Sequence, residues 1–467
     1  MKNLLKKASV DKYLDADQRL ERTLTAKDLL FLGVGAVIGT GIFILPGHEA
    51  AAHAGPAVSI AFLVAALLSG IVGMAYAEFS SAMPIAGSGY TYGSVIYGEL
   101  VGWILGWCLI IEYMLAVSAE ATGFAAYFNN NILTSLGVHL PASLTNGPLQ
   151  GGGVNLTAII IMLIIGAILL GGAKISTRVE NNLVILKISI ILLFIVVGAF
   201  FIKPSNYVPF YPKEFQSGLW GLGGISTATA TVFFAFLGFD GLAANSAETK
   251  DPQKNVAKGI IGTVIVSTVL YVVFSLVLVG MVNYKLLGVD DPAAFAFKVL
   301  HSIMWNKLIT IGALIGIFTA LLSTTLATSR IIYAFGRDHL IFPALGKVDQ
   351  KSKLPINSLV TTVIIATVLA GFVPLDNLLQ LVNAGTLVAF VLIPLGIIPL
   401  RRRKDIVNEG FKMPGYPVLP ILAALASLYY LLVLPNETKI LTSIWIIIGI
   451  LVYIFYGSKH SKITNGK

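Results

Sequence analysis

The sequence predicts an all-α integral membrane protein with about twelve transmembrane helices. Of its 467 residues, 56% are hydrophobic and only 12% are charged, whereas soluble domains carry about 25% charged residues. A helix needs about 20 apolar residues to cross a bilayer, so the chain has room for twelve helices and their loops. None of the apolar runs alternates in the manner of a membrane barrel strand. The composition excludes a soluble enzyme, a nucleic-acid-binding domain and a disordered protein.

The twelve predicted segments are separated by short polar stretches. The third and eighth are long enough to require a strong tilt or an extension beyond the bilayer. The segments are 28–53, 56–82, 90–128, 155–173, 179–202, 218–248, 257–282, 307–335, 356–373, 376–400, 417–434 and 440–457.

The distribution of Lys and Arg predicts the orientation of the chain. With the N-terminus inside, 24 of the 32 basic residues fall in inner segments and six in outer loops. Cytoplasmic loops carry the Lys and Arg excess, so we expect a multi-pass protein of the cell membrane with both termini in the cytoplasm. The net charge of +9 then reflects topology, and nucleic acid is not expected as a partner.

Two other features concern processing and redox state. Residues 1–27 are polar and charged, which predicts a cytoplasmic segment and not a cleavable signal peptide. The single cysteine, Cys108, allows no internal disulfide framework.

Two of the predicted helices contain residues that weaken a helix near mid-membrane. The first has Gly39 and Gly41 with Pro46 beyond them, and the sixth has Gly238 and Gly241. If the chain is divided near residue 210, each is the first helix of a five-helix half. Interrupted helices in matching positions of two halves are typical of a transporter binding site at the repeat interface. The alternative is that these glycines allow close helix packing.

Unwinding inside a membrane has a chemical consequence, because hydrocarbon cannot satisfy the freed backbone groups. The positive end of a half-helix suits a carboxylate, and freed carbonyls suit an ammonium. A zwitterionic amino acid offers both groups. We expect its carboxylate to meet N–H groups around Thr40, Gly41 and Ile42, and its ammonium to meet carbonyls near Ile38 and in 234–237.

Several stretches resemble the amino acid–polyamine–organocation (APC) transporters. Among these, the chain looks most like the cationic amino acid transporter branch and its bacterial relatives. The matching stretches, spread over residues 28–420, are 39–43 (GTGIF), 53–56 (HAGP), 76–79 (YAEF), 83–90 (MPIAGSGY), 234–240 (FAFLGFD), 248–253 (ETKDPQ) and the end of helix eight at 330–338.

The resemblance implies a five-plus-five inverted repeat of the leucine-transporter type followed by two further helices. The implied units are a cytoplasmic segment at 1–27, repeats at 28–202 and 203–400, two helices at 401–457 and a cytoplasmic tail at 458–467. Eukaryotic members of the branch have fourteen helices, and twelve match the bacterial relatives.

Lys187 is the most informative ionisable residue within the predicted spans. It lies about 8 residues from the inner end of helix five, roughly 12 Å, which is too deep for its side chain to reach the interface fully. In proton-coupled relatives, a lysine at this motif position occupies the space where sodium-coupled relatives bind an ion. The resemblance therefore implies proton coupling through Lys187. The alternative is a structural lysine bonded to freed carbonyls of helix one.

The acidic residues near mid-membrane receive different expectations. Glu112 should face the bundle interior, and the resemblance places a Glu-Tyr at 112–113 near the substrate. Glu120 is expected to face outer water, and Asp240 either caps a half-helix or contacts substrate. Glu78 and Glu248, with the loop at Lys250, look like inner-gate elements.

The expected site combines these residues. The substrate-binding set is Ile38, Gly39, Thr40, Gly41, Ile42, Glu112, Phe234, Ala235, Phe236 and Leu237, and the proton-coupling residue is Lys187. The six histidines lack metal-ligand spacing, so we expect no metal and no cofactor.

The function expected from the resemblance is secondary active transport of an amino acid. The apolar region around Phe234 and Leu237 favours neutral aliphatic or branched-chain substrates carried with protons by alternating access. A cationic amino acid transporter or an exchanger is the runner-up. A non-transporting sensor is the alternative from another class, and the titratable Lys187 disfavours it. The expected partners are the amino acid, protons and the lipid bilayer, and the sequence leaves open a small single-helix accessory protein.

Overall fold

The computed structural model describes residues 7–8, 10, 22–85, 89–171, 177–349, 354–406 and 408–461. In these ranges the chain is a bundle of helices, and the extended pairing consists of one isolated parallel bridge between Leu24 and Thr249. Most of the predicted segment 1–27 and most of the tail 458–467 lie outside the described residues.

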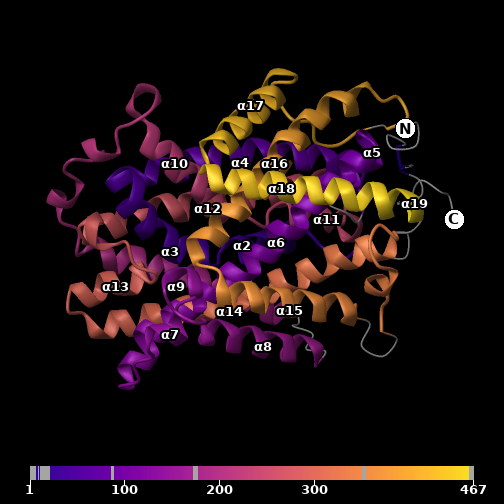
Figure 1. The fold of residues 1–467 in the computed structure, drawn as a ribbon. Coiled ribbons are helices and arrows are strands. Elements are labelled where there is room, and N and C mark those ends of the chain that lie inside the picture. The colour runs from indigo at the N-terminus through magenta and orange to yellow at the C-terminus, as the bar shows by residue number, and fades with distance from the viewer. Residues whose placement is uncertain are drawn as a thin grey trace.

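The helices follow the predicted segments in order along the chain (Figure 1). In the first five-helix half they are α2 (Ala26–Val37) with α3 (Thr40–Glu49), α4 (Val58–Ala82), α6 (Glu99–Tyr127), α8 (Leu156–Leu170) and α9 (Thr177–Ala199). In the second half they are α10 (Gly223–Val232) with α11 (Gly241–Ala244), α12 (Pro252–Met281), α14 (Ile303–Arg337), α15 (Ile356–Phe372) and α16 (Leu375–Arg402). Two helices follow, α17 (Val418–Val433) and α18 (Asn436–Val452), and the short connecting helices are α5 (Gly89–Ile96), α7 (Ala142–Thr145), α13 (Pro292–Val299) and α19 (Ser458–His460).

The third predicted segment differs from expectation. It is not one long tilted helix, because the chain turns at Gly98 and separates α5 from α6. Gly98 has a φ of 108°, a conformation that a residue with a Cβ rarely adopts. The eighth segment is long as predicted. Helix α14 has 35 residues, and its length of about 52 Å exceeds the roughly 30 Å of a hydrocarbon core.

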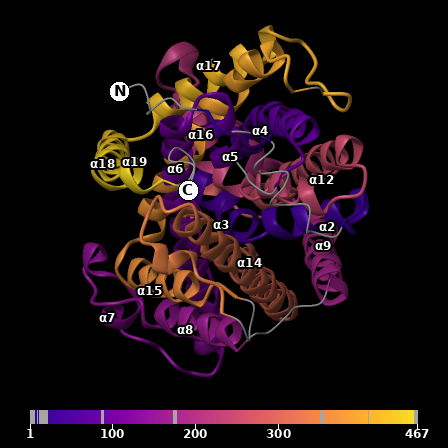
Figure 2. The same ribbon diagram turned by 90° about the vertical axis from the view of Figure 1, so that its right-hand side faces the viewer.

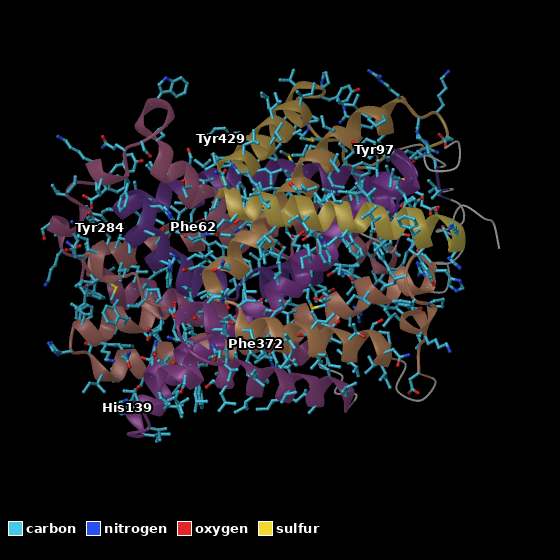
Figure 3. The ribbon with its side chains drawn as sticks, in the orientation of Figure 1. Phe62, Tyr97, His139, Tyr284, Phe372 and Tyr429 are labelled. Atoms are coloured by element: carbon cyan, nitrogen blue, oxygen red, sulfur yellow. The ribbon has the colours of Figure 1, made fainter. Side chains whose placement is uncertain are left out.

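The connections gather at two opposite ends of the bundle. Helices α7 and α13, from connections predicted to be outer, lie at one end, and α19, from the tail predicted to be inner, lies at the other together with α5 (Figure 1). Figure 3 shows Tyr284, in the connection after α12, and Tyr97, in the connection after α5, at these opposite ends. The arrangement matches the predicted order of crossings. Which end faces the cytoplasm remains a prediction from the Lys and Arg residues.

The interior of the bundle is formed by the broken helices. The stretch from α10 to α11 is 78% buried over its most apolar window, whereas α18 is 17% buried. Viewed along the bundle, α18 lies at the edge (Figure 2). Its exposed side chains include the apolar Ile440, Ile444 and Ile447. A face of this kind is stable against lipid, which supports a multi-pass membrane protein.

An ion pair joins two helices at the end of the bundle that is predicted to be inner. Glu78 of α4 is one of the residues predicted to be inner-gate elements. Arg401 of α16 donates from Nε and Nη2 to its carboxylate at 2.7 and 2.8 Å, and Met413 N donates at 2.7 Å. Glu248 contributes through its backbone, because its carbonyl accepts from the N–H groups of Thr23 and Leu24.

Replacement of Arg401 by alanine is expected to destabilise the fold by about 3 kcal/mol, since breaking a buried pair leaves an uncompensated charge. The charge left behind is that of Glu78, whose side chain is 1% exposed. Thermal unfolding in detergent measures the effect. Arg402→Ala is the control, because Arg402 is exposed and its loss should change stability by less than about 0.5 kcal/mol. Equal unfolding of both variants would contradict the prediction.

Candidate functional site at two broken helices

The first helix is interrupted between α2 and α3. Ile38 is extended, with φ −80° and ψ 97°, and Gly39 has φ −143° and ψ −140°. Helix α3 starts at Thr40 without a side-chain cap. The first N–H groups of a helix have no partner within it, so those of Thr40, Gly41 and Ile42 are directed into the interruption.

The sixth helix is interrupted over a longer stretch. After α10 ends at Val232, Phe233–Phe236 form a 3-10 turn, Leu237 is extended, and α11 begins only at Gly241. Gly238 has a φ of 112°, and a Cβ there would lie 3.0 Å from the Cβ of Ala36. In the described part of the chain, no donor reaches the carbonyl oxygens of residues 235–237. These carbonyls are therefore available to a ligand.

The two interruptions are in backbone contact. A Cβ placed on Gly41 would lie 2.7 Å from the Cα and 2.9 Å from the Cβ of Ala235. Real Cβ atoms do not approach this closely, so only glycine fits at position 41. The contact brings residues 38–42 and 234–237 together, as the sequence predicts. The uncapped end of α3 and the free carbonyls of the sixth helix thus share one location.

The end of α2 is held by side chains from two other helices. Lys187 Nζ donates to the carbonyls of Gly35 at 3.0 Å and Ile38 at 3.1 Å. Tyr271 of α12 donates to the carbonyl of Val37 at 2.8 Å. Lys187 is 2% exposed. Its contacts are those expected of a structural lysine that is bonded to carbonyls of the first helix. One lone pair of the Ile38 carbonyl is occupied, so the ammonium of a substrate would use the other or the carbonyls of 235–237.

A second polar group lies beside the interruption of the sixth helix. Thr386 of α16 donates to Glu112 Oε1 at 2.7 Å. Tyr113 donates to the two carboxylate oxygens of Asp240 at 3.1 and 3.2 Å, and Gly238 N donates to Asp240 Oδ1 at 3.3 Å. The charges of Glu112 and Asp240 also interact. Asp240 therefore stabilises the unwound backbone, and Glu112 faces α16 as well as the bundle interior.

Comparison with known proteins identifies the family. A family model described as amino acid permease matches residues 24–456, which is nearly the whole chain. The chain belongs to the amino acid permease family. Membership makes it a membrane transporter. The resemblance to APC transporters is confirmed, and so is the expected all-helical membrane fold.

Three relatives of this permease are named for different substrates. It is 44% identical to a methylthioribose transporter of Bacillus subtilis, over 96% of this chain and 95% of that protein. It is 43% identical to the branched-chain amino acid permease BcaP of Lactococcus lactis, over 98% and 99%. It is 33% identical to the mitochondrial cationic amino acid transporter 3 of Arabidopsis thaliana, over 82% of this chain and 63% of that protein.

Glu120 of the permease does not face outer water, so that prediction is wrong. Its side chain is 5% exposed, and Thr324 of α14 donates to Oε1 at 3.3 Å. A Cβ on Gly39 would lie 3.3 Å from the same oxygen. Glu120 therefore abuts the interruption of the first helix. The sequence does show a glutamate within an apolar run, which is a sign of a functional residue. It does not show where the side chain points, because that depends on the rotation of α6 about its axis.

Aromatic rings surround the interruption of the sixth helix in this permease. The ring centroids of Phe236 and Tyr271 are 5.3 Å apart, and Phe62 packs edge-to-face with Tyr271 at a centroid distance of 5.8 Å. Tyr271 thus both holds α2 and adds apolar surface, a double role that the sequence did not indicate. Farther along α6, Trp103 is fully buried and stacks on Trp107, with 5.2 Å between the ring centroids.

Proposed function

We propose that the permease carries neutral aliphatic or branched-chain amino acids across the cell membrane by proton-coupled symport. The observation that carries this proposal is the contact of Gly41 with Ala235, which sets uncapped N–H groups opposite free carbonyls. A buried site of this kind accepts an anion at one end and a cation at the other. In an α-amino acid, the ammonium and the carboxylate are attached to the same carbon atom.

The amino acid binds through its backbone in this proposal. Its carboxylate accepts hydrogen bonds from the N–H groups at the start of α3, near Thr40, Gly41 and Ile42. Its ammonium donates to carbonyls of the stretch 235–237 and to the remaining lone pair of Ile38. Main-chain recognition leaves the side chain of the substrate against the rings of Phe236 and Tyr271, which suits an aliphatic group.

The choice of a neutral substrate rests on the relatives. Glu112 does not decide it, because its Oε1 accepts from Thr386 while its buried Oε2 has no hydrogen-bond partner among the described residues. The two relatives named branched-chain amino acid permease are 43% and 42% identical to this chain, and the cationic transporters are 30–34% identical. These values favour branched-chain amino acids over cationic ones.

Methylthioribose is the second candidate, because a relative named for it is 44% identical. Methylthioribose is an uncharged sugar and carries neither a carboxylate nor an ammonium. It would leave the N–H groups of α3 without an anion, whereas an amino acid supplies one. Backbone geometry therefore favours the amino acid, and direct competition between the two substrates separates the candidates.

Coupling is assigned to Lys187 in this proposal. When Lys187 carries a proton, its ammonium holds the carbonyls of Gly35 and Ile38 and so fixes the end of α2. Loss of the proton weakens this hold and frees α2 to move relative to α3. The inward and outward states then differ in proton affinity, which is the requirement for coupling two ligands. Residues 28–202 and 203–400 are the two inverted repeats that move against one another, and both termini are cytoplasmic.

Uptake into proteoliposomes tests the proposal. Labelled leucine, alanine, arginine and methylthioribose are offered with and without an inward proton gradient. We expect leucine to accumulate and the gradient to stimulate its uptake, while arginine and methylthioribose compete poorly. If methylthioribose or arginine is taken up in preference to leucine, the proposed substrate is wrong and the preferred compound takes its place. If leucine uptake is unaffected by the gradient, the permease is an exchanger or facilitator. Binding of leucine without any uptake would indicate a sensor.

A further inference from the structure

Two polar atoms without partners lie at the interruption of the first helix. Glu120 Oε2 and Thr40 Oγ1 are buried, and neither has a hydrogen-bond partner among the described residues. Glu120 and Gly123 lie on one face of α6, one turn apart. A Cβ on Gly123 would lie 3.1 Å from Thr40 Oγ1, and one on Gly39 would lie 3.3 Å from Glu120 Oε1. Thr40 Oγ1 and the carboxylate of Glu120 therefore lie at the break between α2 and α3.

The surroundings of Glu120 contain one opposite charge. From α14, Thr324 donates to Oε1. From the interrupted helix, Gly39 and Thr40 face the carboxylate without charge. From α9, Lys187 brings its positive charge to the residue next to Gly39, because its Nζ donates to the carbonyl of Ile38 at 3.1 Å. In the described part of the chain it is the opposite charge that acts on Glu120. Glu112 lies on the same helix, about two turns away, and pairs with Thr386.

We propose that Glu120 accepts the proton that Lys187 releases, so that the two residues form one proton-exchanging pair across the break in the first helix. This inference rests on the proposed coupling through Lys187 and adds the group that receives the proton. In the exchange an N–H bond of the lysine ammonium breaks and an O–H bond forms at Glu120 Oε2. The amine and the carboxylic acid that result are both neutral, so the pair has zero net charge before and after.

The physical reason for pairing is the cost of burying a lone charge. A buried ion without a counter-charge is strongly disfavoured, whereas a neutral pair or a salt bridge is tolerated. Glu120 has hydrogen-bonding capacity left at Oε2, which has no partner among the described residues and can take up a proton. The amine left on Lys187 holds the carbonyls of Gly35 and Ile38 less strongly. The exchange thus links the proton to the end of α2.

Release then completes the cycle. The acid proton of Glu120 leaves to the inner water, and a proton from the outer water binds the amine of Lys187. One proton has crossed, and the pair returns to ammonium and carboxylate. Glu120 is a positioning and proton-accepting residue in this scheme, and it does not bind the amino acid.

Glu120→Gln is the variant that tests the pair, because glutamine keeps the shape but holds no exchangeable proton. The full-length variant is reconstituted and assayed for leucine exchange between labelled and unlabelled pools, and separately for uptake driven by a proton gradient. We expect exchange to be retained and the gradient-driven part of uptake to be lost. A pH indicator inside the vesicles should show that leucine entry no longer carries protons. The double variant with Lys187→Ala should show no additional loss, since the pair acts as a unit.

Glu99→Gln is the matched control, because Glu99 is a fully buried carboxylate on the same helix that accepts from Tyr453 at the inner end. It should keep gradient-driven uptake. If wild type itself ignores the gradient, the proposed coupling and this inference both fail. If the proton gradient drives leucine uptake equally in the wild type and in Glu120→Gln, only the inference about Glu120 is overturned. Should the glutamine variant not fold, Glu120→Asp is used, and an unchanged pH profile of uptake would overturn the inference.

Discussion

Replacement of Gly41 by valine is expected to abolish substrate binding, with affinity falling at least about 100-fold, since small displacements of positioning groups have effects of this size. Even the Cβ would lie 2.7 Å from the Cα of Ala235, so one of the two backbones must move. The movement separates the uncapped N–H groups of α3 from the carbonyls of the sixth helix. Equilibrium binding of labelled leucine to the purified protein in detergent measures the loss.

Gly70→Ala provides the control for this substitution. Gly70 lies on α4, and its added Cβ would meet Val264 Cγ1 at 3.7 Å, an ordinary van der Waals contact. Binding should therefore be unchanged. Thermal unfolding of both variants separates a local effect at the site from a global loss of folding. Undiminished leucine affinity in a folded Gly41→Val protein would remove the backbone site from the proposal.

Lys187→Ala is expected to make uptake independent of the proton gradient. Coupling between two ligands is typically worth about 5–150-fold in affinity, and this factor should fall to one when the titrating group is removed. The variant also leaves the carbonyls of Gly35 and Ile38 without their donor. An unsatisfied buried group costs about 1–3 kcal/mol, so a lower unfolding temperature is expected as well. Uptake in proteoliposomes and thermal unfolding measure the two effects.

Lys187→Arg separates coupling from structure. Arginine keeps the donors and the charge but does not lose its proton in proteins. If proton exchange at this position drives transport, the arginine variant should be stable and uncoupled. Lys285→Ala is the control, because the Lys285 side chain is 65% exposed and lies in the connection after α12. Gradient-driven uptake that survives in Lys187→Arg would assign Lys187 a structural role alone.

Local sequence determined the membrane class, the positions of the crossings and the two interruptions. Hydropathy is a sum over neighbouring residues, so each crossing is visible without knowledge of its partners. Gly39 and Gly238 mark backbone that leaves the helix, and the structure interrupts both helices at these points. The hydropathy pattern could not separate α5 from α6, because only Tyr97 and Gly98 lie between the two helices.

Tertiary structure alone decided which side chains meet. Lys187 was visible as a buried charge, but its contacts with Gly35 and Ile38 depend on how α9 packs against α2. The same holds for Arg401 with Glu78, which are far apart in sequence. The inward direction of Glu120 depends on the rotation of α6 about its axis. These helices are apolar around their whole circumference, so their sequences show no polar face from which the rotation of a helix could be predicted. Only the packing of the helices determines whether a given side chain faces the interior or the lipid.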